Sequence, residues 1–230
     1  MRVRPGFPAP EIPDTLPKKH HHHPGDTTIS VVTVNDDFAT PRSNLPHLHA
    51  GVILGQETKV VNSQHALGKD YGVHQDTDRL DKKGTTVAWK KDRFHELRSG
   101  YAMGVEPHGR EMLTRWINFT DMEVGGKKVR MVSVHRPPER FKSLWPLFDK
   151  NLAEFVKKSK LPVIIGMDAN QHDPQALAKL TGLDWHAPKG SIDGFLTTPG
   201  IKVSHMRRLH KGSSDHHPVQ AQFTIPDGLT

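Results

Sequence analysis

The chain has 230 residues, a formal net charge of +7, 34% hydrophobic and 25% charged residues, and no cysteine. This composition excludes disulfides, thiolate metal sites and a cysteine nucleophile, and it argues against wholesale disorder. The positive charge favours an anionic partner such as nucleic acid, and the lack of a signal segment or of an apolar run near roughly 20 residues predicts a soluble, cytoplasmic protein.

The first 26 residues are rich in proline and contain the run "HHHH". A segment with so few apolar residues cannot bury enough surface to offset its ordering entropy, so we predict a disordered tail over 1–26 and one domain over 27–230. The histidines could bind a transition metal. Because no second ligand cluster follows them closely in the sequence, a solvated polar tract is the favoured interpretation.

Short apolar runs separated by turn residues follow from Thr27 onward, and this pattern predicts strands. We expect strands over 29–35, 51–57, 85–90, 115–120, 129–135, 163–168, 192–197, 201–205 and 219–225. The Gly-Gly pair in "EVGGKK" predicts a hairpin turn at 123–128. The charged segment 90–98 is interpreted as exposed charge at a strand end.

Two segments have the pattern of helices. Apolar residues recur at helical spacing over 142–160, which predicts one amphipathic helix before the strand at 163. The segment "DPQALAKLTG" predicts a short helix with Asp173 as its N-cap, Pro174 at its first position and Gly182 at its end. A β-rich chain with few helices predicts an α/β domain in which two sheets pack on each other and are flanked by helices.

Polar side chains end four of the predicted strands. They are Asn35, Glu57, His135 and Asp168. Asp193 lies in a further apolar run, and Asp215 and His216 come directly before the last strand. Each residue alone is best explained as a cap or a turn former, but binding sites gather where strand ends and loops meet. Together these residues predict one polar cleft.

These motifs resemble the endonuclease/exonuclease/phosphatase superfamily, which includes deoxyribonuclease I and the abasic-site endonucleases. The resemblance covers residues 27 to 226 and rests on "TVN", "QE", "VSVHRPP", "DAN", "IDGF" and "SDHHP". It implies a four-layer α/β/β/α sandwich of two packed mixed β-sheets flanked by helices. Met167 departs from the usual glycine of the family, and Asp36 and Asp37 replace an apolar residue.

The resemblance implies a metal-dependent phosphoric ester hydrolase. Mg²⁺ prefers hard oxygen ligands, and we expect Glu57 to bind it with Asn35 and Asp215 close by, with Mn²⁺ as an alternative ion. Zinc is disfavoured because the chain lacks a His-Glu-x-x-His motif.

The remaining matched residues have expected catalytic roles. His216 is a candidate general base or phosphate contact, and Asp193 would accept its ring N–H and fix its tautomer. Asp168 and Asn170 would hold the attacking water, and the sequence leaves open whether its proton goes to Asp168 or to His216. His135 would donate to a phosphate oxygen or to the leaving group.

Basic residues near these motifs are candidate phosphate contacts. Arg115 could clamp a non-bridging oxygen, although a solvated arginine at a strand end explains it equally well. Arg207, Arg208 and Lys211 precede the "SDHHP" motif and could follow a phosphate backbone, whereas the competing interpretation is a solvated charged face.

The leading functional hypothesis is a Mg²⁺-dependent phosphodiesterase that hydrolyses DNA, acting as an endonuclease. A second hypothesis keeps the same centre but assigns it a small phosphoester, such as an inositol phosphate or a phospholipid head group. A third is a catalytically inactive nucleic-acid-binding or scaffold domain. That third hypothesis predicts the loss of an essential group, whereas every candidate group is present in the sequence.

Overall fold

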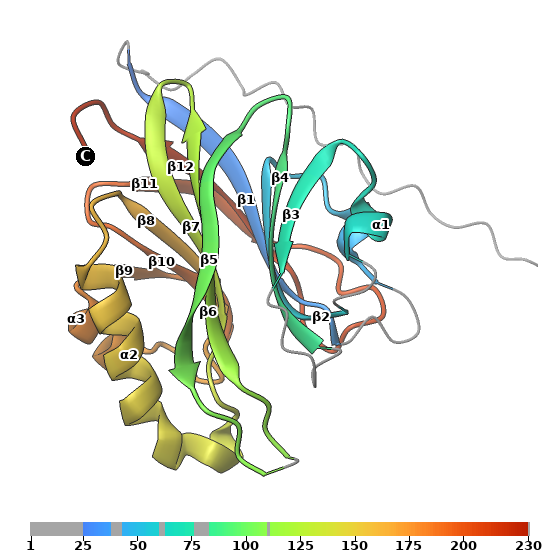
Figure 1. Cartoon of the computed structure of the whole chain (residues 1–230), viewed down its shortest axis with the longest axis vertical. Helices are drawn as coiled ribbons and strands as arrows, with labels where there is room; N and C mark the ends of the chain where they lie inside the picture. Colours follow the sequence, from blue (N-terminus) through green and yellow to red (C-terminus); the bar gives the residue numbers. More distant parts are fainter. Residues whose placement is uncertain (1–24, 38–42, 60–62, 76–82, 110, 230) are drawn as a thin grey trace, which may run out of the picture.

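The computed structural model describes residues 25–37, 43–59, 63–75, 83–109 and 111–229. The predicted tail, including its histidine run, lies outside the described residues except for its last two positions. The remaining residues form two β-sheets that pack face to face, with helices on the outside (Figure 1).

The first sheet has six strands in the order β11-β12-β1-β2-β4-β3. Its strands are β1 (Thr27–Asn35), β2 (Val52–Lys59), β3 (Tyr71–Gln75), β4 (Lys83–Lys90), β11 (Lys202–Arg208) and β12 (Val219–Ile225). The central pair β1 and β2 is parallel, and every other neighbouring pair is antiparallel.

The second sheet also has six strands, in the order β5-β6-β7-β8-β10-β9. Its strands are β5 (His95–Val105), β6 (Arg115–Val124), β7 (Lys127–His135), β8 (Val163–Asp168), β9 (Asp184–His186) and β10 (Asp193–Thr197). Here β7 and β8 form the parallel central pair. The predicted hairpin turn joins β6 to β7, and both of its glycines, Gly125 and Gly126, have positive φ, at 54° and 75°.

The main core fills the space between the two sheets, where Ile29, Leu54, Met131, Phe195 and Phe223 are buried. The sheets approach closely beneath the strand ends, because a Cβ atom added at Gly166 would lie 2.8 Å from the Cβ of Leu54. A glycine at this position therefore lets the two sheets meet.

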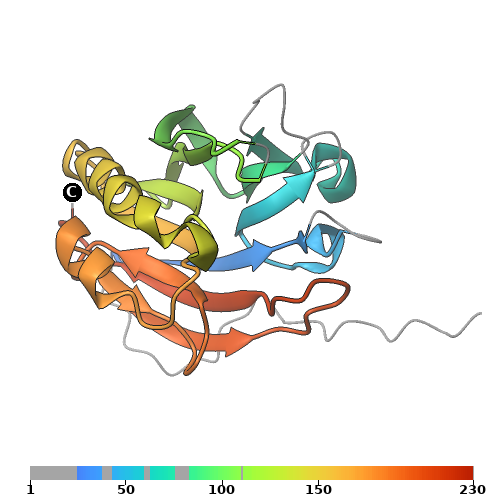
Figure 2. The same ribbon diagram turned by 90° about the horizontal axis from the view of Figure 1, so that it is seen from below.

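Helices cover the outer faces of both sheets. Helices α2 (Trp145–Lys157) and α3 (Gln175–Thr181) pack on the second sheet, and a 3-10 helix, η3 (Glu139–Leu144), leads into α2. The first sheet carries η2 (Leu45–His47) and the short α1 (Ser63–Leu67). Figure 2 shows α2 and α3 together on one side and α1 on the other. The predicted four-layer sandwich is confirmed.

Several elements differ from the prediction. Strands β3, β5 and β9 were not expected, and the charged segment 90–98 enters β5, an edge strand that is exposed over His95–Arg98. The predicted N-cap is wrong: α3 begins at Gln175 with Pro174 in the cap position, and the carboxylate of Asp173 accepts a hydrogen bond from the side chain of Gln175. The backbone of Asp173 has φ of 48°, so it lies outside the extended geometry that an N-cap needs. None of the described helices is long and apolar enough to span a membrane.

Candidate active site

The two parallel strand pairs bring the predicted strand-ending residues to one edge of the sandwich. Asn35 on β1 is in register with Gln56 on β2, and His135 on β7 is in register with Asp168 on β8. Because parallel strands end at the same edge, the two sheets place these side chains opposite each other. The Nδ2 of Asn35 donates across the gap to Oδ2 of Asp168 at 3.0 Å.

Asp168 is the central carboxylate of the site. It is 1% exposed, and its Oδ2 lies 3.3 Å from Nε2 of His135 and 3.8 Å from Nε2 of His216. Its Oδ1 accepts a hydrogen bond from the backbone N–H of Asn170 at 2.8 Å. One buried carboxylate thus contacts an amide, a peptide N–H and two imidazoles from four separate segments of the chain.

The tautomer of His135 follows from its neighbours. Nη1 of Arg115 lies 3.0 Å from Nδ1 of His135, and a guanidinium can only donate. Nδ1 therefore accepts, and the single ring proton is on Nε2, which faces Asp168. The structure brings Arg115 into the site, while the proton that was expected to serve the substrate is held by Asp168.

His216 pairs with Asp193 at the other side of Asp168. Strand β10 runs antiparallel to β8 with Asp193 in register with Asp168, and Oδ2 of Asp193 lies 2.8 Å from Nδ1 of His216. Ser214 fixes the turn before β12, because its hydroxyl donates to the carbonyl of Asn35 and accepts from the N–H of His216. The expected His–carboxylate pair is present in the structure.

Charge and burial set the protonation of this group. Burial alone would raise the pKa of Asp168, but the hydrogen bond and charge of His135, followed by the charge of His216, lower that pKa to about 2. Burial would likewise lower the pKa of His216, but the hydrogen bond and charge of Asp193, with the charge of Asp168, raise that pKa to about 9. Burial raises the pKa of Asp193 against the opposing effect of His216. At neutral pH, His216 is an imidazolium beside an ionised Asp168.

Glu57 reaches the site through an irregularity in its strand. The pairing of β2 with β4 shifts register between Gly55 and Thr58, and Glu57 within this interruption has φ of 50°. Bulges of this kind redirect a side chain. The Oε1 of Glu57 lies 3.7 Å from Nδ1 of His135, with 20% of the side chain exposed. The bulge therefore delivers a partly open carboxylate next to the buried group.

The position of Asn170 is fixed by its backbone conformation and by a hydrogen bond to Arg136, which itself forms a buried ion pair. Its φ is 49°, and its Nδ2 donates to the carbonyl of Arg136 at 2.8 Å. The guanidinium of Arg136 forms a two-point ion pair with Asp149 of α2 and donates to Gln171. Helix α2 thus fixes the position of the loop after β8.

The donor set fits a divalent cation. Ligand atoms of Asp168, Asp193 and His216 all lie within 4.8 Å of one another, so these residues could hold a metal ion. Oδ1 of Asp193 is buried and has no hydrogen-bond partner among the described residues, so an oxygen is left for a cation or a donor. This group differs from the expected ligands, of which it contains none.

The expected ligands surround that group. Glu57 lies beside His135, and the amide of Asn35 is engaged, since its Oδ1 accepts from the N–H of Asp37. The side chain of Asp215 is 77% exposed, with Oδ1 3.7 Å from Nε2 of His216. The structure therefore places Asn35 within the buried group and Glu57 and Asp215 beside it, and it does not show the three as ligands of one common coordination sphere.

The basic segment of the sequence lies on β11 and in the loop after it. Arg207 donates to the side chain of Gln220, Arg208 donates to the carbonyl of Lys189, and all three predicted cations, including Lys211, are exposed. These side chains face solvent on the segment that leads to His216. The solvated and the phosphate-binding interpretations both remain compatible with this placement.

Asp36 has a structural function that the sequence analysis did not predict. It is 1% exposed and accepts hydrogen bonds from the hydroxyl of Ser43 and the N–H of Asn44. Asn44 in turn donates to the carbonyl of Lys211. The acidic residue that departs from the family pattern thus anchors the basic loop to the end of β1.

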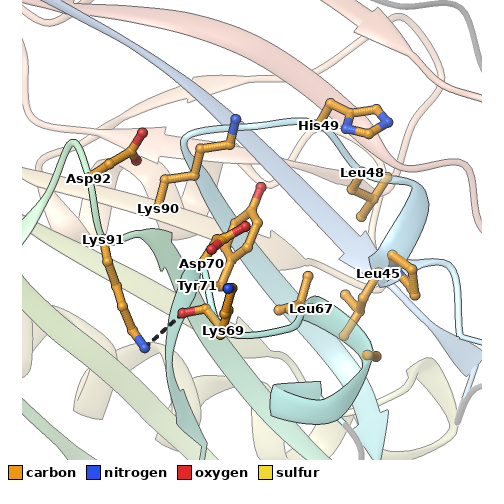
Figure 3. Close-up of a pocket in the computed structure, with 12 residues that line it drawn as sticks. Leu45, Leu48, His49, Leu67, Lys69, Asp70, Tyr71, Lys90, Lys91 and Asp92 are labelled. Carbon is orange, nitrogen blue, oxygen red and sulfur yellow. Dashed lines mark hydrogen bonds between the residues drawn. The ribbon is translucent and has the colours of Figure 1, made fainter.

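A cavity of about 530 Å³ lies on the outer face of the first sheet, away from these groups. Leucines, Tyr71 and three lysines line it, and none of its lining residues belongs to the predicted site (Figure 3). One of the lysines, Lys91, donates to the carbonyl of Lys69 at 3.0 Å. Because Asp70 and Asp92 also line the cavity and offset the lysines, its charge indicates no particular ligand.

Known structures resemble this fold although no family model and no curated protein sequence matches the chain. An endonuclease/exonuclease/phosphatase family protein from Bacteroides thetaiotaomicron aligns over 87% of this chain and 99% of its own with a TM-score of 0.69 and 14% identity. A humanized TDP2 of D. rerio aligns over 86% and 99% with a TM-score of 0.66 and 18% identity. A mannosyl-6-phosphatase of Bacteroides thetaiotaomicron aligns over 86% and 100% with a TM-score of 0.64 and 14% identity. The chain has the fold of the endonuclease/exonuclease/phosphatase superfamily.

Proposed function

We propose that this protein is a Mg²⁺-dependent phosphodiesterase that hydrolyses DNA as an endonuclease, with Mn²⁺ as an alternative ion. The observation that carries the proposal is the contact of one buried carboxylate, Asp168, with Asn35, His135 and the His216–Asp193 pair. The superfamily fold supports the broader class, hydrolysis of phosphoric esters.

Glu57 would hold the divalent cation together with Asn35 and Asp215. Once bound, such a cation neutralises charge on phosphoryl oxygens and acidifies a coordinated water. The buried group of Asp168, Asp193 and His216 offers an alternative set of ligand atoms. We favour Glu57 because Asp193 is already committed to His216, whereas the carboxylate of Glu57 is partly open to solvent.

Asp168 and Asn170 would orient the attacking water. The pKa of Asp168 is about 2, so its carboxylate is an ionised acceptor at neutral pH, and Asn170 is fixed beside it by two hydrogen bonds. His216 with a pKa of about 9 is a proton donor, which favours its role as a contact to a phosphate oxygen over that of general base. Arg115, held at His135, adds a second cation for the phosphate.

DNA is the proposed substrate because the chain is basic and because its exposed cations adjoin the site in sequence. The net charge is +7, and Arg207, Arg208 and Lys211 lie on the segment leading to His216. Cations in such positions bind a phosphate backbone without reading its sequence.

A small phosphoester is the second candidate. One specific observation favours it: a structure with 86% coverage of this chain is named a mannosyl-6-phosphatase. The third candidate, an inactive binding domain, has less support because the acidic groups and imidazoles of the site are intact and in contact.

A substrate panel tests these candidates. Purified protein with Mg²⁺, with Mn²⁺ or with chelator is offered plasmid, single-stranded DNA, abasic duplex, RNA, inositol phosphates and mannose 6-phosphate. We expect metal-dependent nicking of plasmid, lowered at least about 100-fold by His216→Ala, since removal of a charged contact to the transition state has effects of this size. Turnover of only the small phosphoesters would replace the leading proposal with the second candidate, and no turnover at all would favour the third.

Glu57→Gln tests the metal assignment with a readout that is independent of catalysis. Mg²⁺ should raise the unfolding temperature of the wild-type protein through binding to the folded state, and this shift should be lost in the variant. The matched control is Glu139→Gln, an exposed glutamate on η3, which should keep both the shift and the nicking activity. If Mg²⁺ raised the unfolding temperature of Glu57→Gln as much as that of wild type, the metal would be assigned to the group of Asp168, Asp193 and His216.

A further inference from the structure

An aromatic cluster connects the edges of the two sheets beside the candidate active site. It consists of His74 on β3, Tyr101 on β5 and Trp116 on β6. The Tyr101 and Trp116 rings meet edge to face with centroids 4.9 Å apart, and the His74 and Tyr101 rings lie within 27° of parallel at 6.5 Å. Three rings from three strands therefore form one continuous surface.

The cluster is rigidly mounted. Nδ1 of His74 lies 2.6 Å from Oδ1 of Asn118, and Nδ2 of Asn118 donates to the carbonyls of His74 and Thr85. Asn118 is fully buried, so these bonds hold the edge of one sheet against the other. A ring surface fixed in this manner loses little conformational entropy when a ligand binds.

The outer part of the cluster is open to solvent. Tyr101 is 47% exposed and Met103 is 43% exposed, and both lie on the same face of β5, paired with Asn118 and Trp116. A single exposed apolar side chain is ordinary, as Leu97 on the same strand shows at 42%. Tyr101 differs from Leu97 because its exposed ring packs against two further rings, and an exposed apolar cluster is a candidate binding surface.

The cluster adjoins the proposed phosphate contact. Trp116 directly follows Arg115, whose guanidinium lies 3.0 Å from His135. Asn118, the partner of Tyr101, is three residues along β6, so the ring of Tyr101 lies about 10 Å from the level of Arg115 by the rise of a strand. A ligand that contacts Arg115 with a phosphate and Tyr101 with a ring would therefore have to cover about this distance along the strand.

The order of the strands places this cluster opposite the basic segment. Strands β3 and β5 are the edges of their sheets on one flank, whereas β11 and β9 are the edges on the other flank. A polymer that crosses the site from Arg207 and Arg208 would leave it over the aromatic rings. Cations that follow the backbone together with aromatic rings that stack on bases are the combination typical of proteins that bind single-stranded nucleic acid.

We propose that the aromatic cluster is a base-stacking subsite for single-stranded nucleic acid, in which an unpaired nucleobase stacks on Tyr101 while Arg115 contacts a neighbouring phosphate. The inference rests on the proposed function, because it adds that the same centre binds its DNA substrate where a base is unpaired or unstacked. Paired bases hide their faces within the duplex, so only an unpaired or unstacked base presents a face to Tyr101.

Binding of labelled oligonucleotides in chelator tests the subsite without cleavage. The probes are a thymidine oligomer of about 12 nucleotides and an oligomer of equal length with abasic tetrahydrofuran units, which keeps the phosphates and removes the bases. Wild-type protein should bind the thymidine oligomer more tightly. Tyr101→Ala should weaken that binding about 5-fold or more and leave the abasic oligomer unaffected, because one stacked base contributes about 1–3 kcal/mol.

Two further variants make the result specific. Tyr101→Phe keeps the ring and should bind the thymidine oligomer as tightly as wild type. Leu97→Ala removes a similarly exposed apolar side chain from the same strand and should bind both probes as wild type does. Equal losses on both probes in Tyr101→Ala, or no loss on either, would overturn the subsite.

The outcome separates the subsite from the proposed function. Plasmid nicking by a protein that shows no preference for bases over abasic units would refute the subsite and leave the nuclease in place. Base-dependent binding through Tyr101 in a protein that cleaves no nucleic acid would support the subsite and refute the nuclease.

Discussion

His216 shows how strongly two carboxylates can bias one imidazole. Asp193 lies on one side at 2.8 Å and Asp168 on the other at 3.8 Å, and together they raise the pKa of His216 to about 9 despite burial. Because this pKa is raised on folding, the contribution of His216 to stability is complete below its ordinary value of 6.5 and is lost as the pH rises toward about 9. The pKa of Asp168 is lowered, so its contribution is complete above 3.8 and is lost as the pH falls toward about 2.

The titration of His216 can be followed by NMR in the metal-free protein. We expect a pKa near 9 in wild type and a fall toward or below 6.5 in Asp193→Asn, because burial then acts with only the more distant carboxylates to oppose it. Asp92→Asn changes an exposed aspartate at the cavity on the outer face of the first sheet and should leave the pKa of His216 unchanged. The resonance is assigned by its absence in His216→Gln. A wild-type value close to 6.5 would contradict the arrangement described for the pair.

Most of the central residues could be predicted from the sequence because each follows a recognisable apolar strand. Asn35, His135 and Asp168 are the last residues of their strands, and the register brings them to one edge. Arg136 and Asp149 could not be predicted. One follows a proposed site residue and the other lies on a helix face, and only the packing of α2 shows that they meet. Their pairing depends on tertiary structure, which strand and helix periodicity do not encode.

At the scale of elements, the buried ion pair of Arg136 and Asp149 links α2 to the loop after β8, which carries Asn170 of the candidate site. The guanidinium also stacks over Trp145, at 4.0 Å from the ring centroid, and the carbonyl of Arg136 holds Asn170. Burial raises the pKa of Asp149 against the opposing effect of Arg136, so the carboxylate depends on its partner to stay ionised.

Breaking this pair should destabilise the protein more than removing it whole. Arg136→Met leaves Asp149 buried without its cation, and we expect the free energy of unfolding to fall by about 3–5 kcal/mol. The double variant Arg136→Met, Asp149→Leu should recover most of that loss, because well-packed apolar residues often replace a buried ion pair at no cost. Urea denaturation measures both.

The control for this series is Arg140→Met, an exposed arginine of η3, which should change stability by no more than about 0.5 kcal/mol. If Arg136→Met were as mild as Arg140→Met, α2 would not hold the loop through this pair. If the double variant were as unstable as the single one, lost hydrogen bonds to Gln171 and lost stacking on Trp145 would outweigh the unpaired charge.

The elements that the sequence predicted share one property, which is a buried apolar face. Strands β8 and β12 match their predicted ranges, and β8 is buried throughout. Strand β5 escaped prediction because it is an edge strand with both faces partly in solvent, so charged residues interrupt any alternation. Strand β3 is short, and among the described strands it pairs with β4 alone.

At the scale of the whole molecule, the positive charge should govern binding of nucleic acid. Each phosphate contact made by a cation releases counterions, so affinity falls with salt. Replacing Arg208 by alanine should weaken binding of the thymidine oligomer and reduce the slope of log affinity against log salt by about 1. Lys128→Ala removes an exposed cation at the end of β7 that is opposite to His135, and it should leave the slope unchanged.

A slope that is equal in wild type and Arg208→Ala would show that the β11 segment is a solvated face and does not follow the backbone. Fluorescence anisotropy over a series of salt concentrations measures both slopes under one set of conditions.

The four-layer architecture itself could be predicted because the sequence motifs resemble those of a known superfamily. Periodicity alone indicated sheets and helices but could not order the strands, since pairing between distant segments leaves no local pattern.

The bulge that carries Glu57 has a consequence for how this protein would change under selection. A backbone with positive φ is strained for a glutamate but not for a glycine. Glu57→Gly would therefore relieve this local strain and at the same time remove the carboxylate. Laboratory evolution toward heat resistance alone would accept that exchange and discard the proposed metal ligand. Selection for catalytic activity would instead retain Glu57, although a left-handed backbone conformation is unfavourable for a glutamate.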